Sequence, residues 1–119
     1  MSRRVYWVKR RLKYLRMWRE TAKAIARAVK DLDPLAEVYV VGGAAEDRLT
    51  VLSDIDTVVV PSRPLDSKAV DQLRREAYAR ATDSYNLPWD YPVEVHIMQR
   101  EEFEEVLLRR GKGVIKVGN

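Results

Sequence analysis

Two aspartates separated by one residue are the strongest candidates for chemistry in this sequence. Asp54-Ile55-Asp56 leads directly into the apolar run Val58-Val59-Val60, as expected where a strand enters a core. Side chains two residues apart on a strand point to the same side, and two carboxylates held that closely repel each other unless a cation lies between them. Carboxylate oxygens favour Mg²⁺, with Mn²⁺ as the alternative ion. The triplet therefore predicts a metal site, although a lone Asp-x-Asp is also common on solvated loops.

A glycine pair and a third carboxylate accompany the aspartates. Ten residues lie between Gly42-Gly43 and Asp54, and glycines let a backbone approach phosphate oxygens closely, although many simply turn the chain. Glu94 and His96 alternate with apolar residues and share one face of a predicted strand. If that strand neighbours the aspartate strand, three carboxylates and a phosphate cradle fit two-metal phosphoryl or nucleotidyl transfer. His96 would either contact the nucleotide or a water molecule beside Glu94, or be an ordinary hydrogen-bonded residue on a strand face.

The apolar periodicities predict one mixed α/β (α+β) domain over residues 1–119, made of a long basic helix at 1–33 and a catalytic core at 36–119. The core would be a small mixed sheet of three to four strands flanked by helices. The expected elements are a helix over 3–31, strands at 37–41 and 55–60, a helix over 66–83, a strand at 93–98 and a helix over 100–110. Residues 114–117 would be a short strand or a tail.

Composition excludes several classes of site. The chain has no cysteine, which removes disulfides and thiolate chemistry, and its single histidine, His96, precludes a multi-histidine zinc site within one chain. No apolar run approaches the ~20 residues of a membrane span, and no secretory signal is visible. We therefore expect a soluble cytoplasmic protein.

The N-terminal helix concentrates positive charge. Residues 1–30 hold eleven of the 22 Lys and Arg residues and a single acid, Glu20. A helix over residues 3–31 would be roughly 42 Å long against a radius of gyration of ~13 Å for a compact domain, so its first turns should overhang. They would meet a protein partner, a second copy in a homodimer, or RNA. Aromatic residues alternate with arginines there, as on a stacking and phosphate-binding surface, although a solvated face and core packing explain them equally well: Trp7, Arg10, Arg11, Tyr14, Arg16 and Trp18.

Taken together, these motifs resemble the DNA polymerase beta-like nucleotidyltransferase superfamily. The resembling pattern is Gly42-Gly43, a ten-residue gap, Ser53-Asp54-Ile55-Asp56 with its apolar run, and Val93-Glu94-Val95-His96. Within the superfamily, the chain looks most like the minimal nucleotidyltransferases. The resemblance implies a nucleotidyltransferase fold in which Asp54 and Asp56 hold two Mg²⁺ ions and Glu94 completes the catalytic site. It also implies that Gly42, Gly43 and Ser53 contact the nucleotide.

The sequence departs from the family pattern near the glycine pair. The second glycine position is often serine in the family, whereas Gly43 offers only its backbone. An arginine-glycine pair is often found where Glu46-Asp47 stand here, with Arg48 just after them. Arg48 is therefore the best candidate for a phosphate contact from this loop. These departures affect the expected nucleotide affinity more than the metal site.

The resemblance implies a Mg²⁺-dependent transferase that moves a nucleoside monophosphate, AMP from ATP, to an acceptor presented by another molecule. In the minimal family that partner is typically a HEPN-type helical protein, the two often forming a toxin–antitoxin pair, and some members transfer AMP to a tyrosine of the partner. One alternative is a catalytically inactive module that keeps the fold and binds a partner or RNA. Another is a stand-alone transferase for a small molecule, such as an aminoglycoside.

Overall fold

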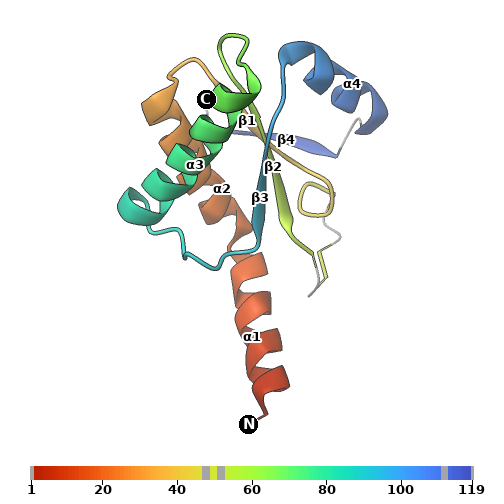
Figure 1. Cartoon of the computed structure of the whole chain (residues 1–119). Coiled ribbons are helices and arrows are strands. Elements are labelled where there is room, and N and C mark those ends of the chain that lie inside the picture. Colours follow the sequence, from red (N-terminus) through yellow and green to blue (C-terminus); the bar gives the residue numbers. More distant parts are fainter. Residues whose placement is uncertain (1, 47–48, 51–52, 111–112, 119) are drawn as a thin grey trace.

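The chain folds as helices packed on a four-stranded sheet (Figure 1). The computed structural model describes residues 2–46, 49–50, 53–110 and 113–118. Its elements are α1 (Arg3–Arg16), α2 (Trp18–Leu32), β1 (Glu37–Val41), β2 (Ile55–Val60), α3 (Ser67–Ser84), β3 (Val93–Ile97), α4 (Arg100–Arg110) and β4 (Val114–Val117). This confirms the predicted mixed α/β class.

The sheet has the strand order β3-β2-β1-β4. β1 pairs antiparallel with both β2 and β4, and β3 runs parallel to β2, with α3 as the crossover between them. The predicted strands at 37–41 and 55–60 and the helix over 100–110 are confirmed, and the predicted strand at 93–98 ends one residue earlier, at Ile97. The last segment is a strand, because it pairs with β1 over residues 114–117.

The two faces of the sheet are covered unequally. Helices α2 and α3 pack on one face, where Ile25 and Val29 meet buried strand residues such as Val59 (Figure 1). On the other face, Phe103 of α4 packs against a small apolar cluster that includes Val58. Because strand side chains alternate between faces, Asp56 shares the α4 side with Val58. It lies on the part of that face where side chains stay partly exposed.

One buried hydroxyl group in the sheet is expected to lower the stability of the fold. Thr57 is fully buried, and its Oγ1 has no hydrogen-bond partner among the described residues. Thr57→Val should therefore raise the free energy of unfolding by about 1 kcal/mol, because an unsatisfied hydroxyl is replaced by a methyl group of similar size. Urea denaturation would measure the change. Thr21→Val is the matched control: it makes the same change at another buried threonine, whose hydroxyl is not a buried atom without a partner, so no gain in stability is expected. A destabilised Thr57→Val would contradict this account.

The predicted single N-terminal helix is wrong in one respect, because it is two consecutive helices. The break falls at Met17, whose φ of −94° and ψ of 18° depart from helical values. The sequence contains no Gly or Pro there, so tertiary contacts decide the break: α2 packs on the sheet, whereas α1 turns its polar side toward the loop before β3. No helix in the described part of the chain is both long and apolar enough to cross a bilayer.

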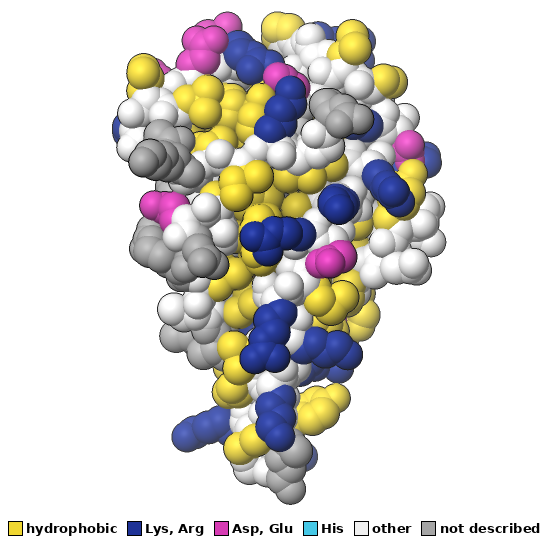
Figure 2. Space-filling view, turned by 180° about the vertical axis from the view of Figure 1, so that it is seen from behind, with side chains coloured by type: hydrophobic (Ala, Val, Ile, Leu, Met, Phe, Trp, Pro, Cys, Tyr) yellow, Lys and Arg dark blue, Asp and Glu magenta, His cyan; other side chains and the backbone are white. Residues whose placement is uncertain are grey.

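Helix α1 projects from the body, as the length of the basic segment predicted (Figure 1). The molecule measures 49 × 33 × 25 Å along its principal axes. The predicted apolar stripe becomes buried only from Leu15 onward, whereas Val5 is 44% exposed and Leu12 is 36% exposed. The projecting part carries Lys, Arg and hydrophobic side chains, with no acidic side chain in view (Figure 2).

An ion-pair network joins β1, α4 and β4. The Glu37 carboxylate accepts a hydrogen bond from Arg100 and lies 3.9 Å from the Lys116 ammonium. The Arg100 hydrogen bond, together with the Tyr39 hydroxyl and the nearby positive charges, lowers the pKa of the Glu37 carboxyl below its ordinary 4.5. A carboxyl with a lowered pKa stabilises the fold above its ordinary pKa, and this stability is lost as the pH falls through the lowered value.

We therefore expect Glu37→Gln to lower the free energy of unfolding by up to about 1 kcal/mol at pH 7. As the pH falls below 4.5, the ordinary pKa of the group, the difference between wild type and variant should shrink. Urea unfolding of both proteins from pH 7 to pH 3 measures this difference at each pH. A difference that stays constant over the range would show that the Glu37 charge contributes nothing.

Candidate active site

Three chain segments meet at one end of the sheet. The register pairs Asp56 with Glu94 across β2 and β3, and pairs Val41 with Asp56 across β1 and β2. The backbone N–H of Ile55 donates to the Pro92 carbonyl at 2.8 Å, which fixes the start of β2 beside the start of β3. The glycine pair that follows β1 therefore lies at the same end as the aspartates. This is the neighbour relation on which the predicted three-carboxylate site depended.

Side chains from α3 hold β3, the edge strand, in place. Tyr78 donates a hydrogen bond to the Val93 carbonyl at 2.8 Å, and Arg74 donates to the Val95 carbonyl at 3.0 Å. These bonds satisfy carbonyls that an edge strand would otherwise leave to solvent. Burial raises the pKa of the Tyr78 hydroxyl, so it stays a neutral donor over the ordinary pH range. Glu94 and His96 lie on the face of β3 that points away from α3.

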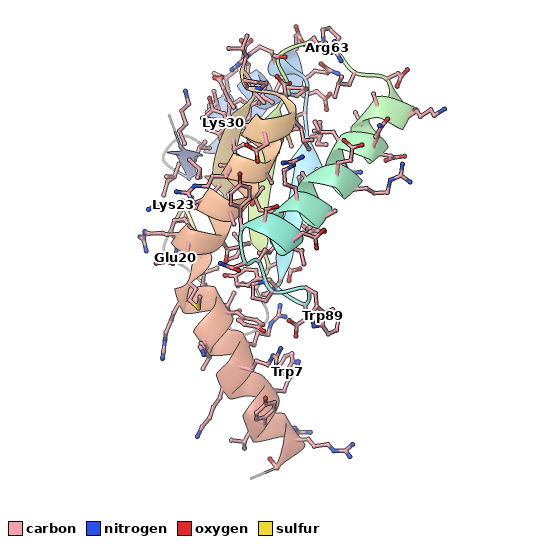
Figure 3. The ribbon with its side chains drawn as sticks, turned by 90° about the vertical axis from the view of Figure 1, so that its left-hand side faces the viewer. Trp7, Glu20, Lys23, Lys30, Arg63 and Trp89 are labelled. Atoms are coloured by element: carbon pink, nitrogen blue, oxygen red, sulfur yellow. The ribbon has the colours of Figure 1, made fainter. Side chains whose placement is uncertain are left out.

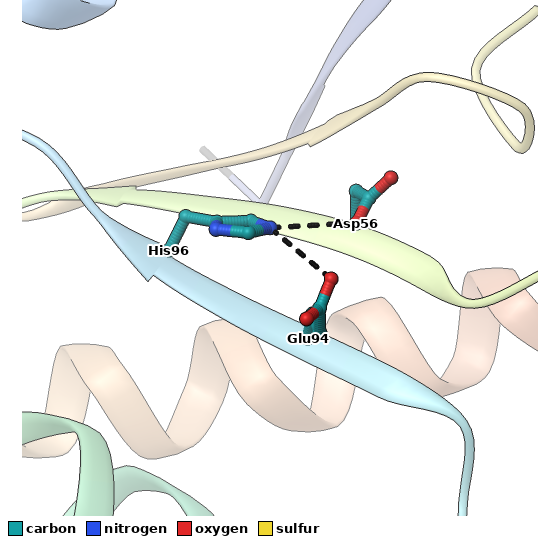
Figure 4. Close-up of side chains that lie close together, drawn as sticks. All are labelled: Asp56, Glu94 and His96. Carbon is teal, nitrogen blue, oxygen red and sulfur yellow. Dashed lines mark hydrogen bonds and ion pairs between the residues drawn. The ribbon is translucent and has the colours of Figure 1, made fainter.

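Asp56, Glu94 and His96 form a compact cluster on the α4 side of the sheet (Figure 4). The His96 Nε2 atom lies 3.4 Å from Asp56 Oδ1 and 3.6 Å from Glu94 Oε2. One potential ligand atom from each residue falls within 4.8 Å of the other two. The side chains are 35%, 60% and 42% exposed for Asp56, Glu94 and His96, so a ligand can reach all three from solvent.

Asp54 is not a member of this cluster of Asp56, Glu94 and His96. It precedes β2, and its side chain is 49% exposed. Its Oδ1 atom accepts a hydrogen bond from Nη2 of Arg11 at 3.0 Å, and the same nitrogen donates to the Ser53 carbonyl at 3.0 Å. The carboxylate predicted to share a metal site with Asp56 is thus engaged by a guanidinium from α1.

The predicted nucleotide-binding residues lie around the turn after β1 and the segment before β2. Gly42 has a φ of +76°, a conformation that favours glycine, and its carbonyl accepts from the Glu46 N–H at 3.0 Å. Gly43 follows it and is partly buried. The Ser53 hydroxyl accepts a hydrogen bond from the Thr50 N–H at 2.9 Å. Arg48, the predicted phosphate contact of the loop, lies outside the described residues.

The donor set of the cluster fits a divalent cation. Two carboxylates and an imidazole offer oxygen and nitrogen ligands within one coordination shell. Carboxylate oxygens suit Mg²⁺ and Mn²⁺, and an imidazole nitrogen shifts the preference toward the transition metal. Exposed acidic groups also occur without an ion, so the support for a metal is that two carboxylates and an imidazole lie together on one partly exposed region of the sheet.

Sequence analysis identified residues of α1 as a candidate binding surface but did not place them at this end of the sheet. A signal was present: Trp7, Arg10, Arg11 and Tyr14 are spaced as one helix face, and the structure turns that face toward the loop before β3. Tyr14 and Arg10 both hydrogen-bond to Asp90 there. The residue pattern indicates the surface, but its position beside Asp90 depends on tertiary packing.

The sequence matches a known protein family. Residues 22–116 match the family model described as a nucleotidyltransferase domain, so the match begins within α2 and covers the sheet except for the last residue of β4. Helix α1 precedes the matched region. Comparison with curated proteins gives no match. Because the match spans most of the chain, the predicted resemblance and fold are confirmed: the chain belongs to the nucleotidyltransferase domain family and is a nucleotidyltransferase that acts on a nucleoside triphosphate.

Proposed function

We propose that this enzyme transfers AMP from ATP to an acceptor hydroxyl in a reaction that requires Mg²⁺ or Mn²⁺. The proposed site residues are Asp54, Asp56 and Glu94, with His96 beside them. The observation that carries the proposal is the convergence of Asp56, Glu94 and His96 on the partly exposed region of the α4 side of the sheet in a nucleotidyltransferase domain.

The proposed chemistry assigns a role to each side chain. Divalent cations, when bound, would lower the pKa of the acceptor hydroxyl and balance the charge of the departing pyrophosphate. Asp54 and Asp56 would hold the cations, and Glu94 would complete the set and accept the hydroxyl proton. The acceptor oxygen then forms its bond to the α-phosphorus as the bond to the pyrophosphate oxygen breaks. His96, between two carboxylates, would orient them by hydrogen bonding.

The triphosphate would lie against the turn after β1. Gly42 and Gly43 would present backbone N–H groups, and Ser53 and Arg48 would add contacts from the segment before β2. The positive φ of Gly42 supports this placement, because the turn brings the backbone to the end of the sheet where Asp56 lies.

The acceptor would be carried by a second macromolecule, and we propose a HEPN-type protein as the other half of a toxin–antitoxin pair. Support comes from α1, which projects from the body and exposes the large side chains Tyr6 and Trp7 among basic residues. Large exposed side chains of this kind are more typical of a protein interface than of a helix face that only contacts solvent. A second copy of the chain or an RNA would use the same surface.

One observation favours a different function, a catalytically inactive module that binds its partner or RNA. The Arg11 guanidinium is hydrogen-bonded to Asp54, so one of the proposed metal ligands already has a cationic partner. The two functions differ in whether the chain consumes nucleotide.

Transfer of label from α-³²P-labelled nucleoside triphosphates tests the proposal directly. The chain would be incubated with each of the four triphosphates, Mg²⁺ or Mn²⁺, and either the proteins or the RNA of its source cells. We expect label from ATP on one class of acceptor, lost when the cation is chelated. Absence of label from every triphosphate, alongside stable binding of a partner or RNA, would establish the inactive module instead.

A further inference from the structure

Arg11 reaches from α1 into the proposed active site. Its Nη2 atom lies 3.0 Å from Asp54 Oδ1 and 3.0 Å from the Ser53 carbonyl oxygen. The Arg11 side chain is 21% exposed, whereas most other side chains of α1 are exposed. Holding a long cationic side chain in this way costs rotamer entropy, which its two hydrogen bonds must offset.

Neighbouring contacts fix where Arg11 can be. Its guanidinium lies 5.6 Å from the ring centroid of Trp7, one turn earlier on the same helix. One turn later, the backbone carbonyl of Tyr14 accepts a hydrogen bond from the Tyr91 hydroxyl, and the Tyr14 hydroxyl bonds to Asp90 at 3.1 Å. Trp7 projects on the side of α1 where the loop carrying Trp89 approaches (Figure 3). Helix α1 is therefore attached to the body at this level.

The position of Arg11 has two electrostatic consequences. A cation on the Asp54 carboxylate competes with any metal ion that this carboxylate binds. The same cation lies at the end of the sheet where the turn of Gly42 and Gly43 would meet a triphosphate, and a guanidinium is a strong hydrogen-bond donor to phosphate oxygens. Arg11 precedes residue 22, where the matched family region begins, so helix α1 brings this positive charge from outside that region.

We propose that Arg11 is a residue of the nucleotide site, which holds the Asp54 carboxylate in position and binds the phosphates of the incoming nucleoside triphosphate. This inference rests on the proposed function. Helix α1 is then part of the active site as well as a projecting surface. A purely structural Arg11 would only attach α1 to the body, and its removal would weaken every ligand in the same direction.

The test measures two dissociation constants in each variant. Mn²⁺ alone is titrated by electron paramagnetic resonance, and ATP with Mg²⁺ is titrated by calorimetry. In Arg11→Ala we expect Mn²⁺ to bind about threefold more tightly, because Asp54 loses a competing cation. We expect ATP with Mg²⁺ to bind roughly tenfold more weakly, because a charge-assisted hydrogen bond to phosphate is lost. The opposite signs distinguish the proposal from a loss of structure.

Two further variants complete the design. Arg11→Lys should keep part of the ATP affinity, because it retains the charge but not the guanidinium geometry. Lys13→Ala removes one positive charge from an exposed position on the same helix and should leave both constants within about twofold of wild type. Thermal melts monitored by circular dichroism confirm that each variant is folded.

The outcomes separate this inference from the proposed function. If wild type binds ATP with Mg²⁺ but Arg11→Ala changes neither constant, or weakens both, the role of Arg11 is wrong and the proposed function stands. If wild type binds neither Mn²⁺ nor any nucleoside triphosphate, both fail together. Opposite changes in Arg11→Ala, with partial rescue by Arg11→Lys, support the inference.

Discussion

Asp56→Asn should abolish nucleotidyl transfer, lowering the rate by at least about a hundredfold. Asp56 is the central carboxylate of the site, since it pairs with β3 on one side and β1 on the other and lies 3.4 Å from His96. The amide keeps the shape of the side chain but loses the charge that a divalent cation requires. Label transfer from α-³²P-ATP measures the rate, and calorimetry measures Mg²⁺-dependent ATP binding.

The fold should survive this change. Two carboxylates lie close to one histidine in the cluster, so removing one negative charge relieves repulsion, and the melting temperature without metal should be unchanged or higher. Asp83→Asn makes the same chemical change on an exposed position of α3 and should leave transfer unaffected. Full transfer activity in Asp56→Asn would exclude a metal-dependent mechanism at this cluster.

Glu94→Gln should separate catalysis from nucleotide binding. We expect the turnover number to fall by about a hundredfold, because the amide can neither accept the acceptor proton nor carry the charge of the third carboxylate. The dissociation constant for ATP should change far less, because Glu94 lies on β3, across β2 from the glycine turn where the triphosphate would lie. Steady-state kinetics with labelled ATP and calorimetry on the same preparations give the two quantities.

Glu101→Gln on α4 is the matched control for Glu94→Gln, since it removes an exposed carboxylate from the first turn of a helix. Its turnover number should equal that of wild type. An equal turnover number in Glu94→Gln would assign Glu94 to the solvated edge of the sheet and leave only the aspartates as candidates.

The strands could be predicted from sequence because their signals are local. Ile55 to Val60 is a run of strand-forming residues interrupted only by Asp56, and Val93 to Ile97 alternates apolar with polar residues. The same alternation placed Asp56 and Glu94 on one face, and the parallel pairing of β2 and β3 brings them together. For these residues, side-chain direction follows from backbone period once the strands are neighbours.

The rest depends on tertiary contacts that no local pattern carries. The helix break at Met17 has no Gly or Pro to announce it, and it follows from the way α1 and α2 pack on different parts of the molecule. Asp54 precedes β2, so strand alternation does not fix its direction, and its contact with Arg11 joins residues 43 positions apart. The role of His96 was undecided because its position between Asp56 and Glu94 depends on the pairing of two strands.

The measurement that tests the central claim most directly is calorimetric titration of ATP, with and without Mg²⁺, into wild type and Asp54→Asn/Asp56→Asn. We predict binding to wild type that requires Mg²⁺ and is lost in the double variant, while both proteins melt cooperatively. Binding that is the same in the double variant, or that ignores Mg²⁺, would contradict the proposed metal-dependent nucleotide site. Failure of wild type to bind ATP, GTP, CTP or UTP with Mg²⁺ or Mn²⁺ would contradict it as well.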